Sequence, residues 1–197
     1  MDAVVFDLGN VLIEWNPLRV VSEAFVANCD FARWNAELDR GVRFDDVEQM
    51  WAATYPDYAE EVHAFRARWF ETLGDIDDAV VAIVRELRAS GVGVFGLTNS
   101  SMENAPQSHD VQRVFAELDG VVVSGDVGLL KPEPEIYGYT AARFGLDAAR
   151  TWFVDDNAAN VAGAEACGWN AVLFTDAGAL RAALSGAGLV PTGGRSS

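Results

Sequence analysis

The sequence predicts an α/β fold in which a doubly wound parallel sheet carries a small helical domain, inserted after the first strand. Short apolar runs alternate with helical patterns from about residue 76 to residue 190. A purely helical pattern interrupts this alternation between residues 14 and 75. Polar residues directly follow three of the apolar runs. They are expected where parallel strands end at a ligand-binding edge of the sheet.

The first predicted strand is the apolar run Val4–Phe6, which ends in Asp7 and the turn dipeptide Gly9-Asn10. Asn16-Pro17 then has the residues typical of a helix start. From there to about Thr72 we expect four helices and no strand, because the apolar residues keep a helical spacing throughout.

The remaining elements alternate, and turn residues separate them. Four further apolar runs predict strands at Val92–Leu97, Val121–Val123, Trp152–Val154 and Ala171–Phe174. One helix is expected from Asp77 or Asp78 to just before Gly91, and a separate helical segment ends at about Leu118. Three more helices are expected at Pro134–Phe144, Ala158–Cys167 and Ala177–Leu184. We therefore predict a core domain of residues 1–13 and 76–190, a helical insert of residues 14–75 and a disordered tail of residues 191–197.

The charge of the chain restricts its partners. Its 197 residues carry a formal net charge of −16. Nucleic acids and anionic membrane surfaces would be repelled by this charge, so we expect neither as a partner. A small anionic substrate is compatible with the charge if a bound cation or local donors hold it.

Cys29 and Cys167 lie far apart in the sequence, outside any metal-binding or redox spacing. This cysteine usage is typical of a reducing compartment, so we expect a cytoplasmic protein. No stretch approaches the roughly 18 uninterrupted apolar residues of a membrane span. We expect a monomer or a homodimer.

Three strand ends predict a common site. Asp7 follows the first strand, Thr98-Asn99-Ser100 follows the second, and Asp155-Asp156 follows the fourth. Alone, Asp7 could equally cap a turn, but parallel strands end at one edge and should bring these groups together. Crowded carboxylates repel one another unless a cation lies among them, and hard oxygen ligands suit Mg²⁺.

Lys131 is the only lysine of the chain. It precedes a predicted helix in the proline-stiffened loop Leu130-Lys131-Pro132-Glu133-Pro134. A loop lysine alone is typical of a solvated surface. Together with the three strand ends, it is a candidate for neutralising an anionic substrate.

Four motifs, in this order along the chain, resemble those of the haloacid dehalogenase-like hydrolase superfamily. The motifs are Asp7-Leu8-Gly9-Asn10-Val11, Leu97-Thr98-Asn99-Ser100, Leu130-Lys131-Pro132 and Phe153-Val154-Asp155-Asp156-Asn157. The first motif, followed by Trp15-Asn16-Pro17, is most similar to the sugar-phosphate phosphatase branch with a C1-type cap, which includes α-glucose-1-phosphate phosphatase-like proteins. The resemblance implies a Rossmann-like sheet with strand order 5-4-1-2-3 and a helical cap as the insert.

The resemblance also implies a role for each matching residue. Asp7 would attack phosphorus and form an aspartyl phosphate. Asp7, the Gly9 carbonyl and Asp156, with Asp155 beside it, would bind Mg²⁺. The implied activity is that of a Mg²⁺-dependent phosphatase acting on a small phosphorylated metabolite, with a sugar phosphate as the expected substrate.

Two further motifs would hold the phosphate in this family. Thr98 and the backbone of Asn99 would bind its oxygens, and Lys131 would neutralise both Asp7 and the phosphate. Phosphoryl transfer requires an in-line nucleophile and charge stabilisation, which this set supplies.

Gly9 departs from the family pattern, because phosphatases of the superfamily usually have an acid and base Asp at this position. A catalytically impaired, phosphate-binding relative is therefore one alternative. A 2-haloacid dehalogenase is another, in which Asp7 would displace halide from carbon. The pair Asp155-Asp156 argues against dehalogenation, which has no use for two more carboxylates beside an anionic substrate.

Some residues of the insert allow two interpretations. Arg40 and Arg43 flank Gly41 and would either lie on the surface or meet an anionic substrate. The four tryptophans in or next to the insert would either fill a small helical core or stack on a sugar ring, and the core is the favoured interpretation. They are Trp15, Trp34, Trp51 and Trp69.

Overall fold

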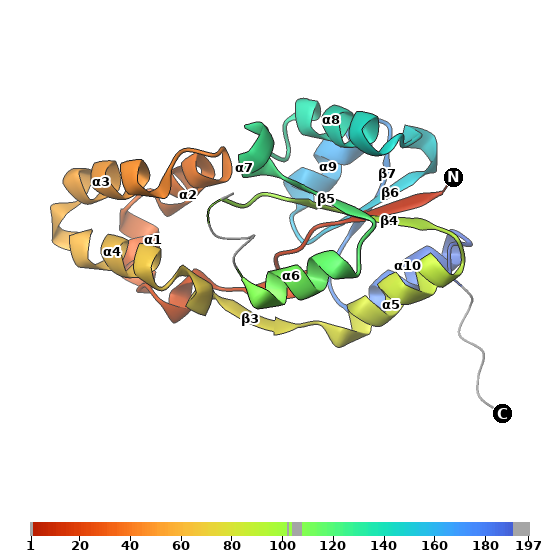
Figure 1. Ribbon diagram of the computed structural model, residues 1–197, viewed down its shortest axis with the longest axis horizontal. Coiled ribbons are helices and arrows are strands. Elements are labelled where there is room, and N and C mark those ends of the chain that lie inside the picture. The colour runs from red at the N-terminus through yellow and green to blue at the C-terminus, as the bar shows by residue number, and fades with distance from the viewer. Residues whose placement is uncertain (1, 102, 104–107, 191–197) are drawn as a thin grey trace.

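The computed structural model describes residues 2–101, 103 and 108–190 (Figure 1). The predicted disordered tail, residues 191–197, lies outside the described residues. The core contains a five-stranded parallel sheet in the order β5-β4-β1-β6-β7. Its strands are β1 (Ala3–Phe6), β4 (Gly93–Thr98), β5 (Gly120–Val123), β6 (Thr151–Asp155) and β7 (Asn170–Leu173). With the five core strands numbered along the chain, this is the order 5-4-1-2-3 viewed from the opposite edge.

Helices cover both faces of the sheet, so β1 is buried on each side (Figure 1). Val4 and Phe6 pack with α5, α6 and α10, whereas Val5 points the other way and packs with α8 and α9. This alternation follows from the two-residue period of a strand. The helices are α5 (Asp78–Ala89), α6 (His109–Ala116), α8 (Pro134–Phe144), α9 (Ala158–Ala166) and α10 (Ala177–Gly186).

The insert folds as a helical cap at one end of the core (Figure 1). Its helices are α1 (Glu23–Asn28), α2 (Phe31–Asp39), α3 (Phe44–Thr54) and α4 (Ala59–Ala67). They enclose an aromatic core of their own, in which the ring centroids of Phe25 and Trp51 are 4.9 Å apart and those of Phe31 and Phe65 are 5.3 Å apart. Trp34 also belongs to this core, in agreement with the favoured interpretation of the insert tryptophans.

The predicted helix start at Pro17 is only partly correct. Asn16 does cap a turn there, but the turn is the short 3-10 helix η1 (Pro17–Arg19). The first α-helix begins at Glu23 instead, where the Ser22 hydroxyl accepts a hydrogen bond from the N–H of Phe25. Other short helices are α7 (Ser124–Val127), η2 (Pro56–Tyr58), η3 (Trp69–Thr72) and η5 (Ala148–Arg150).

The prediction that the insert contains no strand was wrong at the two ends of the insert. β2 (Ile13–Trp15) and β3 (Leu73–Ile76) pair antiparallel and join the cap to the core. Each strand has three or four residues, too few for the alternating pattern that identifies a strand in sequence. This pairing positions Trp15, whose backbone N–H donates to Asn10 Oδ1 over 2.9 Å.

Within the described residues, no helix combines the length and the apolar character needed to cross a bilayer.

Candidate active site

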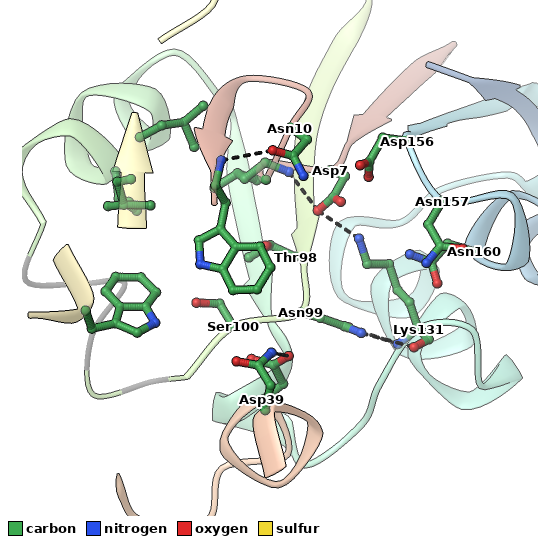
Figure 2. A pocket seen from close by; sticks show the side chains of 18 residues that line it. Asp7, Asn10, Asp39, Thr98, Asn99, Ser100, Lys131, Asp156, Asn157 and Asn160 are labelled. Carbon is green, nitrogen blue, oxygen red and sulfur yellow. Dashed lines mark hydrogen bonds and ion pairs between the residues drawn. The ribbon is translucent and has the colours of Figure 1, made fainter. Parts of the chain in front are cut away.

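The carboxyl ends of β1, β4 and β6 meet at one pocket. Asp7 directly follows β1, and its N–H donates to Val154 O on β6 over 2.8 Å. Thr98 ends β4 on the other side of β1. The pocket between the sheet edge and the cap has a volume of about 300 Å³ and includes Asp7, Thr98, Lys131 and Asp156 in its lining (Figure 2). The three strand ends are thus brought together as parallel pairing requires.

Lys131 lies beneath this edge with its ammonium group between two carboxylates. Its Nζ is 2.8 Å from Asp7 Oδ1 and 2.7 Å from Asp155 Oδ2, and the residue is only 4% exposed. Burial alone would lower the pKa of Lys131, but Asp7 and Asp155 outweigh burial and raise it. The lysine is therefore a fixed positive charge in the site rather than a solvated loop residue.

Asn99 holds this lysine in place. Its side-chain amide donates to Lys131 O over 3.0 Å, and its Oδ1 accepts the Lys131 N–H over 3.0 Å. The side chain of Asn99 thus bonds to the backbone of Lys131. The backbone of Asn99 remains at the end of β4, next to the pocket.

Asp155 and Asp156 are adjacent but differ in environment. Asp155 is fully buried, and its carboxylate accepts hydrogen bonds from the Asn157 N–H and the Asn160 amide over 2.8 to 3.1 Å, besides the contact with Lys131. Asp156 is exposed towards the pocket. Burial and Asp155 raise the pKa of Asp156, although Asn10 and Lys131 oppose the shift. Asp155 therefore anchors Lys131, and Asp156 is the more accessible of the two to a ligand.

Asp7, Asp155 and Asp156 each place one carboxylate oxygen within 4.8 Å of the others. Burial raises the pKa of Asp7 to about 7, with Lys131 opposing the shift and Asp155 adding to it. This cluster has three carboxyl groups and a single ammonium, which contacts two of them, so a negative excess remains. An all-oxygen donor set with a negative excess fits a hard divalent cation such as Mg²⁺.

Comparison with known proteins identifies the family. The family model described as haloacid dehalogenase-like hydrolase matches residues 1–168. The chain belongs to the haloacid dehalogenase-like hydrolase family. This hydrolase is 30% identical over 184 residues to the sesquiterpene phosphatase astK of Aspergillus oryzae (strain ATCC 42149 / RIB 40), covering 88% of this chain and 90% of that protein. It is 26% identical to the (S)-2-haloacid dehalogenase 4A of Burkholderia cepacia, covering 86% and 81% of the two chains.

Solved structures show the same fold. A predicted HAD-like family hydrolase from Porphyromonas gingivalis superposes with a TM-score of 0.69 at 21% identity, over 87% of this chain and 90% of the other. A HAD family enzyme from Bacteroides thetaiotaomicron, in complex with magnesium and inorganic phosphate, superposes with a TM-score of 0.68 at 18% identity, over 89% and 94% of the chains.

The cap of this haloacid dehalogenase-like hydrolase completes the pocket, which the sequence could not show. Trp15, Trp69 and the α2 residues Asn35 and Asp39 belong to its lining, and Figure 2 shows Asp39 facing the core residues. Asp39 was not predicted as a site residue. One local signal could have indicated it, because Asp39 is the last residue of α2 and a carboxylate is unfavourable at the negative end of a helix.

The position of Asp39 shifts its titration. Burial raises the pKa of this carboxyl group to about 7, with Lys131 opposing the shift and Asp7 adding to it. Its Oδ2 accepts a hydrogen bond from the Asn35 amide over 2.9 Å. The group can therefore exist as a neutral carboxylic acid or as a carboxylate near neutral pH.

Replacement of Asp39 by Asn should change the pH dependence of stability. A carboxyl group with a raised folded-state pKa costs stability as the pH rises from its unfolded pKa of about 3.9 towards 7. Asp39→Asn should therefore raise the free energy of unfolding at pH 8 by about 1–2 kcal/mol, with a higher Tm. At pH 4 it should change the Tm little. Thermal denaturation at both pH values checks this. A Tm difference that is the same at both values, or one shared by Glu37→Gln on the same helix, would refute the assigned environment.

Arg40 and Arg43 do not line the pocket. The interpretation in which they meet an anionic substrate was therefore wrong. Arg40 forms an ion pair with Glu133 of the core at 2.6 Å, and Arg43 lies 3.4 Å from Asp45. Both guanidinium groups are exposed, and neither arginine lines the pocket.

Gly9 lies beside Asp7 in the pocket wall. It is not among the described glycines with a left-handed backbone, and a Cβ built there would meet only Trp15 Cβ, at 3.9 Å. The positive φ of this turn falls on Asn10 instead, at 56°. A side chain at position 9 would therefore be tolerated, and no backbone strain explains the glycine.

Proposed function

We propose that this hydrolase is a Mg²⁺-dependent phosphatase that cleaves a small phosphate monoester through an aspartyl phosphate on Asp7. The observation that carries the proposal is the cluster of Asp7, Asp155 and Asp156 at the carboxyl edge of the sheet, in which Asp7 and Asp155 contact Lys131. Similarity to astK, a phosphatase, supports the same reaction class.

Asp7 would act as the nucleophile. Its Oδ1 accepts the Leu8 N–H over 2.7 Å and contacts Lys131, so the carboxylate is fixed in orientation. Among the described contacts none involves Oδ2, which is therefore the oxygen available for attack on phosphorus. Thr98 and the backbone of Asn99 would hold the phosphate oxygens, and Lys131 would offset the charge that accumulates in the transition state.

Asp7, Asp156 and the Gly9 carbonyl would hold Mg²⁺, with Asp155 behind them. When bound, the ion would neutralise the carboxylates and the substrate phosphate. This requirement follows from the site itself, because one lysine shared by two carboxylates leaves little positive charge for a dianionic phosphate.

The organic part of the substrate would lie against the cap side of the pocket. The lining has six apolar residues, of which Trp15, Trp69 and Leu73 belong to the insert: Leu8, Ile13, Trp15, Trp69, Leu73 and Val111. An apolar alcohol, as in the terpenoid phosphate suggested by the name of astK, fits this wall. The sugar phosphate expected from sequence would instead stack on the tryptophans and bond to Asn35 and Asp39.

A 2-haloacid dehalogenase is the second candidate, because one relative carries this activity. Its substrate carboxylate would need a cation of its own. Within the described lining of the pocket, Lys131 is the one basic residue, and it already contacts two carboxylates. The charge balance therefore favours the phosphatase.

Phosphate release with and without metal tests the proposal. The purified protein should hydrolyse p-nitrophenyl phosphate, glucose 1-phosphate or farnesyl monophosphate in Mg²⁺, and EDTA should abolish the activity. The relative kcat/KM values would choose between the sugar and the apolar substrate class. Chloride release from 2-chloropropionate in EDTA, without phosphate release from any ester, would instead establish the dehalogenase. We retain as part of the proposal the cytoplasmic location and the monomeric or homodimeric state.

A further inference from the structure

Within the described lining of the pocket, the core offers the proposed reaction no carboxyl group that is free to act as its proton donor. The oxygen that leaves phosphorus becomes an alkoxide unless it is protonated, and the water that later attacks the aspartyl phosphate must lose a proton. Gly9 has no side chain that could donate or accept these protons. Within the described lining of the pocket the carboxyl groups belong to Asp7, Asp39 and Asp156, and no histidine is present. Asp7 serves as nucleophile and Asp156 as metal ligand, so Asp39 is the carboxyl group without an assigned role.

The cap holds Asp39 firmly over the pocket. The Ser124 hydroxyl donates to Asp39 O over 2.5 Å and accepts the N–H of Ser100 over 2.9 Å, which ties the end of α2 to the loop after β4. The neighbouring Arg40 pairs with Glu133 through two hydrogen bonds of 2.6 and 3.2 Å. These contacts fix the last turn of α2 against the core, although α2 belongs to the cap.

The carboxyl group of Asp39 lies across the pocket from Asp7 (Figure 2). In an in-line displacement the leaving oxygen departs on the side of phosphorus opposite the nucleophile. Asn35 occupies Oδ2 of Asp39, and no contact among the described residues involves Oδ1. A group in this position would meet first the leaving oxygen and then the water that replaces it.

We propose that Asp39 of the cap is the general acid and base of the reaction, in place of the carboxylate missing at Gly9. The inference rests on the proposed phosphatase function. In the first step an Asp7 oxygen bonds to phosphorus, the bond to the leaving oxygen breaks, and that oxygen takes the proton of Asp39 to give the free alcohol. In the second step the Asp39 carboxylate takes a proton from water, the water oxygen bonds to phosphorus, and the bond to Asp7 breaks. Inorganic phosphate leaves, and Asp39 is protonated again.

The surroundings of Asp39 suit this exchange. Asp7 and Lys131 face it from the core with opposite charges, and Asn35 faces it from its own helix. The raised pKa of about 7 agrees with a group that must both give and take a proton near neutral pH.

Asp39→Asn tests the inference, because the change is isosteric and Asn cannot donate a carboxyl proton. Benzyl phosphate and p-nitrophenyl phosphate are similar in size, but only benzyl alkoxide needs protonation to leave. The variant should lose about 10²–10³-fold in the rate of enzyme phosphorylation by benzyl phosphate and less than about 10-fold with p-nitrophenyl phosphate, both followed in single turnovers. Glu37→Gln removes a carboxylate from the same helix outside the pocket and should match the wild type with both esters.

Gly9→Asp provides a second variant that leaves the cap unchanged. Added to Asp39→Asn, it should restore phosphorylation by benzyl phosphate at least about 10-fold, because the acid returns on the core side of the same oxygen. Equal losses with the two esters, or wild-type rates in Asp39→Asn, would overturn the role of Asp39. So would the lack of any restoration by Gly9→Asp in a protein with wild-type Mg²⁺ affinity. If the wild type itself releases no phosphate, the proposed function fails; if the wild type turns over and Asp39→Asn is unaffected, only this inference fails.

Discussion

Asp7→Asn is expected to lower the phosphatase kcat by at least about 10³-fold, because the variant lacks the nucleophile that forms the aspartyl phosphate. The amide has the shape of the carboxylate, so the β1 end and its hydrogen bond with Val154 O should persist. The substitution removes one negative charge next to Lys131, but Asp155 still pairs with the lysine at 2.7 Å. Steady-state phosphate release in Mg²⁺ measures the effect, and circular dichroism checks the fold.

Asp57→Asn is the matched control, because Asp57 is exposed on the cap. It should retain the wild-type rate. Retention of more than a tenth of the wild-type rate by a folded Asp7→Asn would remove Asp7 from the nucleophilic role.

Lys131→Met should destabilise the protein by about 3–5 kcal/mol in EDTA, since it leaves the buried carboxylates of Asp7 and Asp155 without their cation. Burial already raises the pKa of Asp7 in the presence of the lysine. Mg²⁺ should restore more stability to this variant than it adds to the wild type, because the ion replaces part of the missing positive charge. The kcat in Mg²⁺ should still fall by about 10²–10³-fold, since the phosphate loses a fixed charge partner.

Thermal denaturation in EDTA and in Mg²⁺, together with phosphate release, measures these effects. Arg181→Met is the control, because Arg181 forms a comparable ion pair with Glu86 at 2.7 Å on the surface, where such pairs contribute little. An unchanged Tm of Lys131→Met in EDTA would contradict the electrostatic account of the site.

The core and its strand ends could be predicted from sequence because their signals are local. An apolar run that stops at Asp7 or Asp155 carries both the strand and its polar end within a few residues. Parallel pairing then brings the ends together without further information. Lys131 needed the resemblance to known motifs, since its loop alone does not show which way the side chain points.

The cap side of the site could not be predicted in this way. Asp39 reaches the pocket because Ser124 of the core holds its carbonyl group, a contact between residues 85 positions apart. Trp15 reaches the pocket through the three-residue strand β2, which pairs with residues near position 75. Neither contact leaves a periodic pattern, and Arg40 and Arg43, the more conspicuous residues, lie outside the pocket. Tertiary pairing of short segments decides this side of the site.

Trapping of the intermediate tests the central claim most directly. Wild-type protein mixed with p-nitrophenyl phosphate and Mg²⁺, quenched in acid within the first turnover and digested, should yield a peptide containing Asp7 with the added mass of one phosphoryl group. The same peptide should be unmodified when the reaction is run in EDTA instead of Mg²⁺. It should also be unmodified in the Asp7→Asn variant. Rapid Mg²⁺-dependent phosphate release with the label on another residue, or with no label at any quench time under conditions that preserve acyl phosphates, would contradict the assignment of Asp7 as the nucleophile.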